Sequence, residues 1–188
     1  MTALTAAVLV GSLRKESFTR KLAAAMIKLA PDALSCRIVE IGELPLYNQD
    51  READPPAAWT SFRAAIAGVD GVLFATPEYN RSIPGGLKNA IDVGSRPYGK
   101  NAFEGKAGAV VSITPGAMGG FGANFAVRNA IVFLNVLTMQ QPEAYIGNAK
   151  DLFDETGEVK VESTRIFLAG FMSAFAEWTG LIAARKKS

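Results

Sequence analysis

The chain has 188 residues, of which 49% are hydrophobic and 20% charged, and its net charge is +2. These values fit one globular domain over residues 1–188 with a sizeable core, and they give no basic surface for nucleic acid. The absence of histidine excludes Ser-His-Asp triads, Cys-His pairs and histidine-ligated metals, and a single cysteine, Cys36, excludes an internal disulfide and a cysteine-held iron–sulfur cluster.

The order of the predicted elements indicates an α/β fold. In chain order, apolar runs predict strands at residues 6–10, 36–41, 71–76, 107–114 and 137–140. Apolar residues at helical spacing predict helices over residues 20–30, 57–68, 84–95, 121–136 and 162–183. Strand and helix alternate without a linker or repeat, which is typical of a parallel sheet. The last helix carries an apolar stripe that we interpret as core packing, made of Leu168, Phe171, Met172, Phe175, Trp178 and Ile182.

Three segments, residues 11–19, 77–82 and 112–120, follow predicted strands at the ends where doubly wound sheets bind ligands. The first reads GSLRKESFT and leads into a helix, whose free N–H groups suit a phosphate. Its hydroxyls and Arg14 add donors. It matches neither the dinucleotide fingerprint nor the P-loop, so it favours a terminal monophosphate over a bridging pyrophosphate. The alternative is that Ser17 or Thr19 only caps the helix.

The second and third segments are rich in turn residues and glycine. The sequence PEYNRSIPGGLKNAID spans residues 77–92, and each of its two glycines costs a helix about 1 kcal/mol relative to Ala. Residues 115–122 contain four glycines in eight positions. Such backbone suits the close approach of a flat ligand or of another backbone. The alternative is a tight turn with ordinary helix–sheet packing.

These motifs resemble those of the NAD(P)H-dependent FMN reductases. Within that family, the motifs are most similar to those of the bacterial NAD(P)H:quinone reductases also described as chromate reductases. The motifs that carry this resemblance are GSLRKESF, PEYNRSIPGGLKNAIDVGSR, the later Gly-Gly, PE at 142–143 and TGEV at 156–159. The resemblance implies a flavodoxin-like, doubly wound parallel sheet of five strands in the order 2-1-3-4-5. It also implies a non-covalent FMN, NAD(P)H as co-substrate, and a dimer or a dimer of dimers with flavin sites near the subunit interface.

The resemblance also assigns roles to residues. The family's phosphate loop falls on Ser12, Arg14, Ser17, Phe18 and Thr19, although many relatives have Asn in place of Thr19. The flavin wall falls on Pro77, Glu78, Tyr79, Asn80 and Ser82, and the backbone of residues 114–120, with Thr114, Gly116 and Gly119, closes the other side. We expect Glu78 and Arg96 to be catalytic. Glu78 would position the ring or the arginine, and Arg96, after the helix over 84–95, would reach over the mouth of the site.

Assembly beyond a dimer is in doubt. Close relatives carry an Arg and a Tyr that link subunits into a tetramer. The matching positions here are Gly122 and Phe125, although Glu143 remains. A polar network of that design cannot form, so we expect a homodimer.

The implied function is an oxidoreductase that passes hydride from NADPH or NADH to FMN and on to quinones, chromate, ferric complexes or similar small acceptors by a ping-pong mechanism. One alternative is a flavodoxin-type electron carrier, which the net charge of +2 disfavours because such carriers tend to be acidic. Another is an FMN reductase that supplies reduced flavin to a partner oxygenase. The run at residues 6–10 is too short to span a bilayer, and the N-terminus lacks a signal-peptide pattern, so we expect a cytoplasmic protein without a membrane partner.

Overall fold

A parallel β-sheet forms the centre of the computed structural model, which describes residues 4–185. Its strands are β1 (Leu4–Val10), β2 (Leu34–Ile38), β3 (Gly71–Thr76), β4 (Ala107–Ile113), β5 (Leu137–Thr138) and β6 (Ala144–Ile146). The helices are α1 (Phe18–Lys28), α2 (Ala57–Ala67), α3 (Gly85–Gly94), α4 (Phe121–Val132) and α5 (Glu162–Arg185), with short 3-10 turns at Gln49–Arg51 and Ala149–Asp151. The strand order is β2-β1-β3-β4-β5, so the predicted flavodoxin-like α/β fold is confirmed.

The outer position beside β4 is divided between two short strands. β5 pairs with Ala107 and Gly108, whereas β6 pairs with residues 111–113 at the other end of β4. The described sheet therefore has six strands where the sequence predicted five. β6 was missed because its three residues are too few to show an alternating pattern. The predicted helix over 121–136 also ends early, at Val132, and Asn135 turns the chain toward β5 with a φ of 56°.

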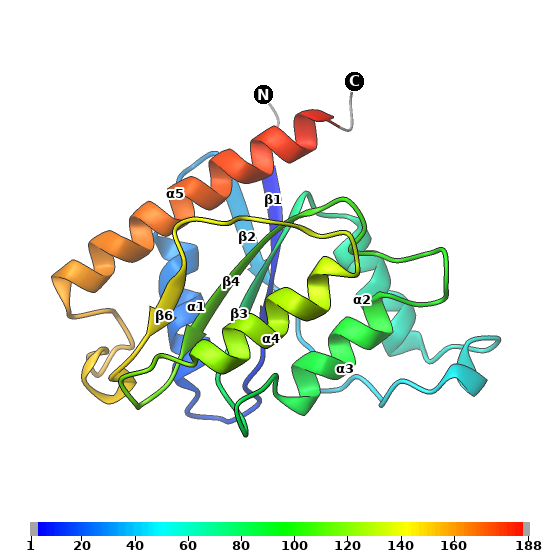
Figure 1. The fold of residues 1–188 in the computed structure, drawn as a ribbon, viewed down its shortest axis with the longest axis horizontal. Coiled ribbons are helices and arrows are strands. Elements are labelled where there is room, and N and C mark those ends of the chain that lie inside the picture. Colours follow the sequence, from blue (N-terminus) through cyan, green and yellow to red (C-terminus); the bar gives the residue numbers. More distant parts are fainter. Residues whose placement is uncertain (1–3, 186–188) are drawn as a thin grey trace.

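Helices cover both faces of the sheet (Figure 1). Alternate strand residues point to opposite sides, so Val8 and Leu73 join one hydrophobic cluster while Leu9 and Phe74 join the other. The first cluster packs against α1 and α5, and the second against α2, α3 and α4. β1, β3 and β4 are apolar along nearly their whole length because both of their faces are covered.

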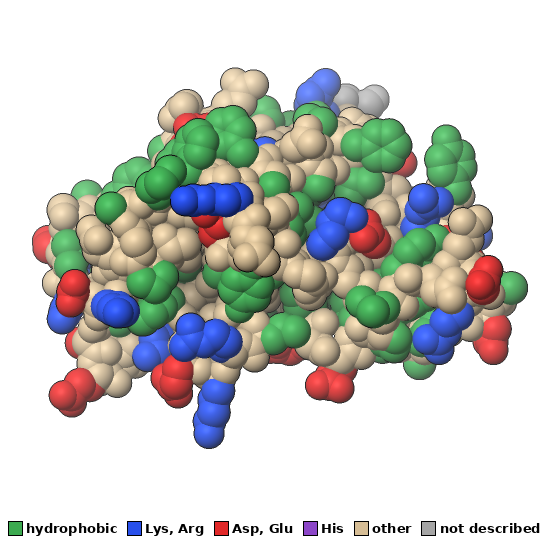
Figure 2. Space-filling model, turned by 60° about the horizontal axis from the view of Figure 1, so that its bottom comes forward, with side chains coloured by type: hydrophobic (Ala, Val, Ile, Leu, Met, Phe, Trp, Pro, Cys, Tyr) green, Lys and Arg blue, Asp and Glu red, His purple; other side chains and the backbone are tan. Residues whose placement is uncertain are grey.

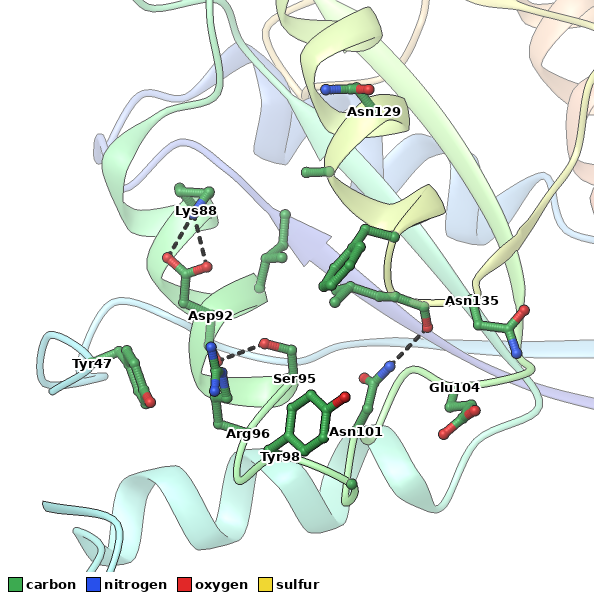
Figure 3. Close-up of a pocket in the computed structure, with 15 residues that line it drawn as sticks. Tyr47, Lys88, Asp92, Ser95, Arg96, Tyr98, Asn101, Glu104, Asn129 and Asn135 are labelled. Atoms are coloured by element: carbon green, nitrogen blue, oxygen red, sulfur yellow. Dashed lines mark hydrogen bonds and ion pairs between the residues drawn. The ribbon is translucent and has the colours of Figure 1, made fainter. Parts of the chain in front are cut away.

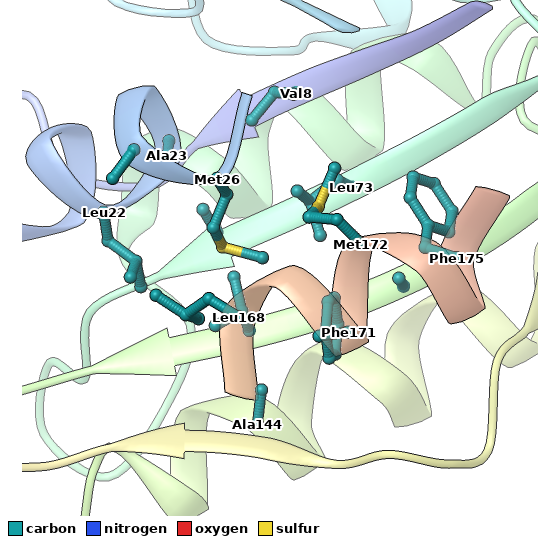
Figure 4. Packing of buried hydrophobic residues seen from close by; sticks show 14 of the residues in the cluster. Val8, Leu22, Ala23, Met26, Leu73, Ala144, Leu168, Phe171, Met172 and Phe175 are labelled. Carbon is teal, nitrogen blue, oxygen red and sulfur yellow. The ribbon is translucent and has the colours of Figure 1, made fainter. Parts of the chain in front are cut away.

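The apolar stripe of α5 forms a large part of one cluster, as Figure 4 shows. Leu168, Phe171, Met172 and Phe175 are fully buried, Ile182 is nearly so, and Trp178 is partly buried against them. The prediction that this stripe is core is confirmed. By length and composition alone α5 would also pass as a membrane-crossing helix. The stripe from Leu168 to Ile182 packs against the sheet, whereas Ile166 and Leu181 of the same helix are exposed.

Candidate active site

Three loops meet at the edge where β1, β3 and β4 end. β1 lies between β2 and β3, and β3 lies between β1 and β4, so the segments after them are neighbours. Gly11 joins the first two loops, because its N–H donates to the Ala75 carbonyl over 2.8 Å. A Cβ at Gly11 would lie 3.1 Å from the Pro77 ring. The segments at 11–19, 77–82 and 114–120 therefore share one edge, as the sequence predicted for a parallel sheet.

The loop between β1 and α1 presents unused hydrogen-bond donors. Ser12 and Thr19 are 4% and 1% exposed, and within the described residues neither hydroxyl has a hydrogen-bond partner. None of the main-chain N–H groups of residues 12–19 donates to an acceptor in that part of the chain. Arg14 is exposed on the same loop. Hydroxyls without a partner, free N–H groups at a helix start and a nearby cation form a site suited to an anion.

Ser17 and Phe18 have clear structural roles in this loop. The Ser17 Oγ accepts from the Arg20 N–H over 3.1 Å, so Ser17 is the N-cap of α1. The Phe18 ring stacks on Phe153, with ring centroids 6.4 Å apart. The capping alternative raised from the sequence is therefore correct for Ser17. It leaves Ser12 and Thr19 without such an explanation.

The loop after β3 is a tight turn. Tyr79 and Ser82 exchange two main-chain hydrogen bonds, of 3.2 and 3.0 Å, and the residues between them, Asn80 and Arg81, both have positive φ. This is the geometry of a type I′ turn, which favours Asn followed by Gly. The Tyr79 side chain is 45% exposed, and Asn80 and Ser82 are exposed as well. All three stand at the surface of the edge, where a ligand can reach them.

Glu78 links this turn to α4. Its Oε2 accepts from the Ala123 N–H over 3.0 Å, and its Oε1 accepts from Arg81 Nη1 over 3.0 Å. The side chain of Glu78 is only 11% exposed. The N-cap residue of α4, Gly120, offers no side-chain cap, so the Glu78 carboxylate supplies the missing acceptor and a negative charge at the positive end of the helix.

The glycines of the loop after β4 are explained by different features of the structure. A Cβ at Gly119 would lie 2.5 Å from the Tyr145 carbonyl carbon, and Gly119 and Gly120 have φ of 61° and 78°. These two glycines allow the backbone to turn against β6. A Cβ at Gly116 would meet nothing within 4 Å, so internal packing does not explain Gly116. The Thr114 Oγ1 donates to the Gly116 carbonyl over 3.2 Å and helps to shape the loop.

The site fits the two ends of an FMN molecule. The first loop offers donors to a terminal phosphate, and the turn and the third loop leave exposed backbone for a flat ring. Thirteen of the residues assigned from the resemblance lie on these three loops: Ser12, Arg14, Ser17, Phe18, Thr19, Pro77, Glu78, Tyr79, Asn80, Ser82, Thr114, Gly116 and Gly119. Their contact with the cofactor remains a prediction.

Arg96 is not brought to this edge of its own chain. It follows α3, whose ten residues rise by about 15 Å away from the turn at 79–82. There it lines a cavity of about 640 Å³ between α3, α4 and the loop before β4 (Figure 3). Its guanidinium lies over the Tyr47 ring, 5.8 Å from the centroid. Within one chain, Arg96 therefore lies away from the turn at 79–82, and its role over the mouth of the site stays a prediction.

The surroundings of Arg96 include groups that sequence reasoning missed. Arg51 and Arg63 both lie over the Trp59 ring, at 5.6 and 5.5 Å, and the Tyr47 hydroxyl donates to Glu52 over 2.6 Å. Burial lowers the pKa of Arg63, although Glu52 partly offsets this effect. No sequence signal joins these residues, because they come from three separate segments.

Exposed large side chains lie at or beside the same cavity, which is lined by Tyr98 and Phe133, and Val132 is next to Phe133 in sequence. Tyr98 is 90% exposed, Phe133 86% and Val132 66%. At the other end of α4, Phe121 and Phe125 are about half exposed and in ring contact, with centroids 4.6 Å apart. Such a concentration of large apolar residues on one helix face is typical of a protein–protein contact.

Comparisons with known proteins agree with the fold and the motifs. Residues 4–151 match the family model for NADPH-dependent FMN reductase. A quinone reductase of Pseudomonas putida is 61% identical over 176 residues, which is 93% of this chain and 94% of that protein. A 2-hydroxy-1,4-benzoquinone reductase of a Burkholderia species is 45% identical, covering 94% and 96%. The structure of FerB, a flavoenzyme NAD(P)H:(acceptor) oxidoreductase from Paracoccus denitrificans, superposes with a TM-score of 0.90 at 42% identity, covering 95% and 98%.

Proposed function

Because the chain belongs to the NADPH-dependent FMN reductase family and is an FMN-containing oxidoreductase that uses NAD(P)H, we propose that it is a quinone reductase with a retained FMN and a ping-pong mechanism. In the overall reaction, NAD(P)H, a quinone and one proton give NAD(P)⁺ and a hydroquinone. The quinone receives two electrons and one proton from NAD(P)H and its second proton from water. We propose that the enzyme works in the cytoplasm, where NAD(P)H is available.

The observation that carries this proposal is the set of unused donors after β1. Ser12 and Thr19 are almost wholly buried residues whose hydroxyls have no partner among the described residues, and a phosphate on this loop would supply acceptors for them. Ser12, Thr19 and the free main-chain N–H groups would hold the FMN phosphate, with Arg14 adding a charge-assisted hydrogen bond. Ser17 would contribute through its N–H, because its hydroxyl already caps α1.

The bound FMN would supply the two-electron chemistry, and the protein's own side chains would bind and orient the reactants. The turn at 79–82 and the loop at 114–120 would form the walls on either side of the ring. Glu78 would keep those walls at a fixed separation, because it belongs to the loop at 77–82 and its carboxylate accepts from the start of α4. None of these tasks needs an imidazole, which agrees with the absence of histidine.

We propose a homodimer through the face that carries Tyr98, Val132 and Phe133. Burying three such exposed side chains would favour association. In such a dimer Arg96 would act on the site of the partner subunit, since α3 carries it away from its own. A tetramer built on the relatives' polar network is not expected, because Gly122 has no side chain to offer. Light scattering that reports a monomer at micromolar concentration would contradict the dimer.

Quinones, including hydroxyquinones, are the acceptors we favour. The Burkholderia relative is named for a hydroxyquinone and the Pseudomonas relative for quinones. Chromate and ferric complexes would be secondary acceptors of the same reduced cofactor. The net charge of +2 disfavours a flavodoxin-type carrier. Release of reduced FMN to an oxygenase would show as loss of the flavin on gel filtration.

The decisive experiment is the absorbance spectrum of the purified protein. We expect flavin bands that remain after gel filtration, bleach with NAD(P)H under anaerobic conditions and return with a quinone. Arg14→Ala should lower FMN affinity by about 10-fold or more, the value of a charge-assisted hydrogen bond, without changing the fold. Parallel lines in two-substrate plots would support ping-pong kinetics, whereas intersecting lines would argue against it. A colourless protein that does not take up added FMN would overturn the proposal.

A further inference from the structure

The turn at residues 79–82 contains an arginine where its geometry favours glycine. Arg81 has a φ of 62°, in the left-handed region that residues with a side chain occupy at a cost. Type I′ turns avoid this cost with glycine at the second central position. A backbone held in such a conformation suggests that the side chain at position 81 has a use beyond the turn.

The Arg81 side chain spans two walls of the candidate site. Its Nη1 donates to Glu78 Oε1 over 3.0 Å and lies 3.8 Å from Met118 Sδ, on the loop after β4. Gly122 makes room for this arrangement, since a Cβ there would lie 3.0 Å from the Arg81 carbonyl oxygen. The Arg81 side chain nevertheless remains 74% exposed. Both contacts use Nη1, so the other N–H groups of the guanidinium have no partner among the described residues and are open to a ligand.

The charges around Arg81 leave the opening positive. In the two loops at 11–19 and 77–82 the charged residues are Arg14, Lys15, Glu16, Glu78 and Arg81. Glu78 is 11% exposed and already accepts two hydrogen bonds, and Glu16 pairs with Lys21 over 3.4 Å. In Figure 2, where this edge comes forward, Lys and Arg side chains project from the surface. An anion that approaches the opening therefore meets exposed cations and no free carboxylate on these loops.

We propose that Arg81 is a specificity-determining residue that favours quinones carrying a negative charge, such as ionised hydroxyquinones. An ionised hydroxyquinone is planar and shares its charge between two oxygens in one plane. Its C2 oxyanion and the adjacent C1 carbonyl oxygen lie side by side at the ring edge, where they can accept from two N–H groups of the guanidinium fork. A neutral quinone offers no such charge. This inference rests on the proposed quinone reductase function.

The test compares matched acceptors on the FMN-loaded enzyme. We would measure kcat/KM for 2-hydroxy-1,4-naphthoquinone, which is ionised at neutral pH, and for uncharged 1,4-naphthoquinone, using wild type, Arg81→Asn and Arg81→Lys. Arg165→Gln is the matched control, because Arg165 is also an exposed arginine paired with a glutamate three residues away. FMN content is measured for every variant.

We expect Arg81→Asn to lower kcat/KM for the ionised quinone on the order of 10-fold, mainly through KM, and to change the neutral quinone by less than about 2-fold. Arg81→Lys should restore part of the loss, since it keeps the charge and loses the fork. Added salt should reduce the preference in wild type but not in Arg81→Asn. The Arg165→Gln control should behave as wild type.

Several results would overturn the inference. Equal losses for both quinones would show that Arg81 only maintains the turn. A rise in KM for NADPH or NADH alone would show that it binds the nucleotide. If Arg81→Asn keeps the wild-type preference for the ionised quinone, Arg81 contacts neither the quinone nor the nucleotide. If wild type reduces neither quinone, the proposed function itself fails, which distinguishes that outcome from a failure at Arg81.

Discussion

Removal of the Glu78 carboxylate should destabilise the protein even when no cofactor is bound. The carboxylate holds two elements together, through the 3.0 Å contact with the Ala123 N–H and the 3.0 Å pair with Arg81. A nearly buried, charge-assisted hydrogen bond is worth about 1.5–3 kcal/mol. The Arg81 pair adds less than about 1 kcal/mol, because its guanidinium is solvated. We therefore expect Glu78→Ala to lower the free energy of unfolding by about 2–3 kcal/mol.

Thermal and urea unfolding of the FMN-free protein would measure this effect. For a chain of this size, each kcal/mol shifts Tm by roughly 2–4 °C, so Glu78→Ala should lose about 4–12 °C. Glu78→Gln keeps an acceptor for the Ala123 N–H and should lose about half as much. Glu40→Ala is the control, because Glu40 is 66% exposed and its one ion-pair partner among residues 4–185 is Arg20, so its removal should cost about 1 kcal/mol or less.

A double-mutant cycle would test the geometry directly. A Cβ at Gly122 would lie 2.9 Å from Glu78 Oε2, so Gly122→Ala should disturb the same contact. The two substitutions together should cost less than the sum of their separate effects. A Glu78→Ala protein within about 0.5 kcal/mol of wild type would refute the view that this carboxylate caps α4. It would also remove the reason for assigning the residue a positioning role.

Two further predictions concern other parts of the chain. Burial raises the pKa of the Cys36 thiol to about 11 from an ordinary value of 9.0, so the thiolate fraction near neutral pH falls about 100-fold. Iodoacetamide should therefore alkylate the native protein at least about 100-fold more slowly than the urea-unfolded chain. Similar alkylation rates for the two states would contradict this prediction. A Cβ at Gly94 would lie 2.4 Å from the ring of the buried Phe103, so Gly94→Ala should destabilise the protein by about 1–3 kcal/mol in urea unfolding. Gly170→Ala is the control, because a Cβ there meets nothing within 4 Å, and this substitution should be neutral or stabilising.

Much of the fold could be predicted from the sequence because it follows from local patterns. The runs at 71–76 and 107–113 are apolar on both faces, which indicates strands buried within a parallel sheet. Alternation of these runs with helices gives the layers, and the carboxyl-end rule places three loops at one edge. The positions of the loop at 11–19 and of the turn at 77–82 could be predicted in this way, and phosphate binding at the first of them stays a prediction. The strand order itself came only from the resemblance to a family.

The tertiary structure alone decided how the site residues are used. Glu78 contacts Ala123, 45 residues away, and that contact gives it a helix-capping role that no local pattern indicates. Arg96 comes only two residues after α3, yet the length of that helix places it away from the turn at 79–82, after which α3 begins. No sequence pattern marks Arg81, whose positive φ and position beside Met118 are features of the tertiary structure. Sequence patterns report local conformation and burial, whereas contacts between distant segments depend on how the layers pack together.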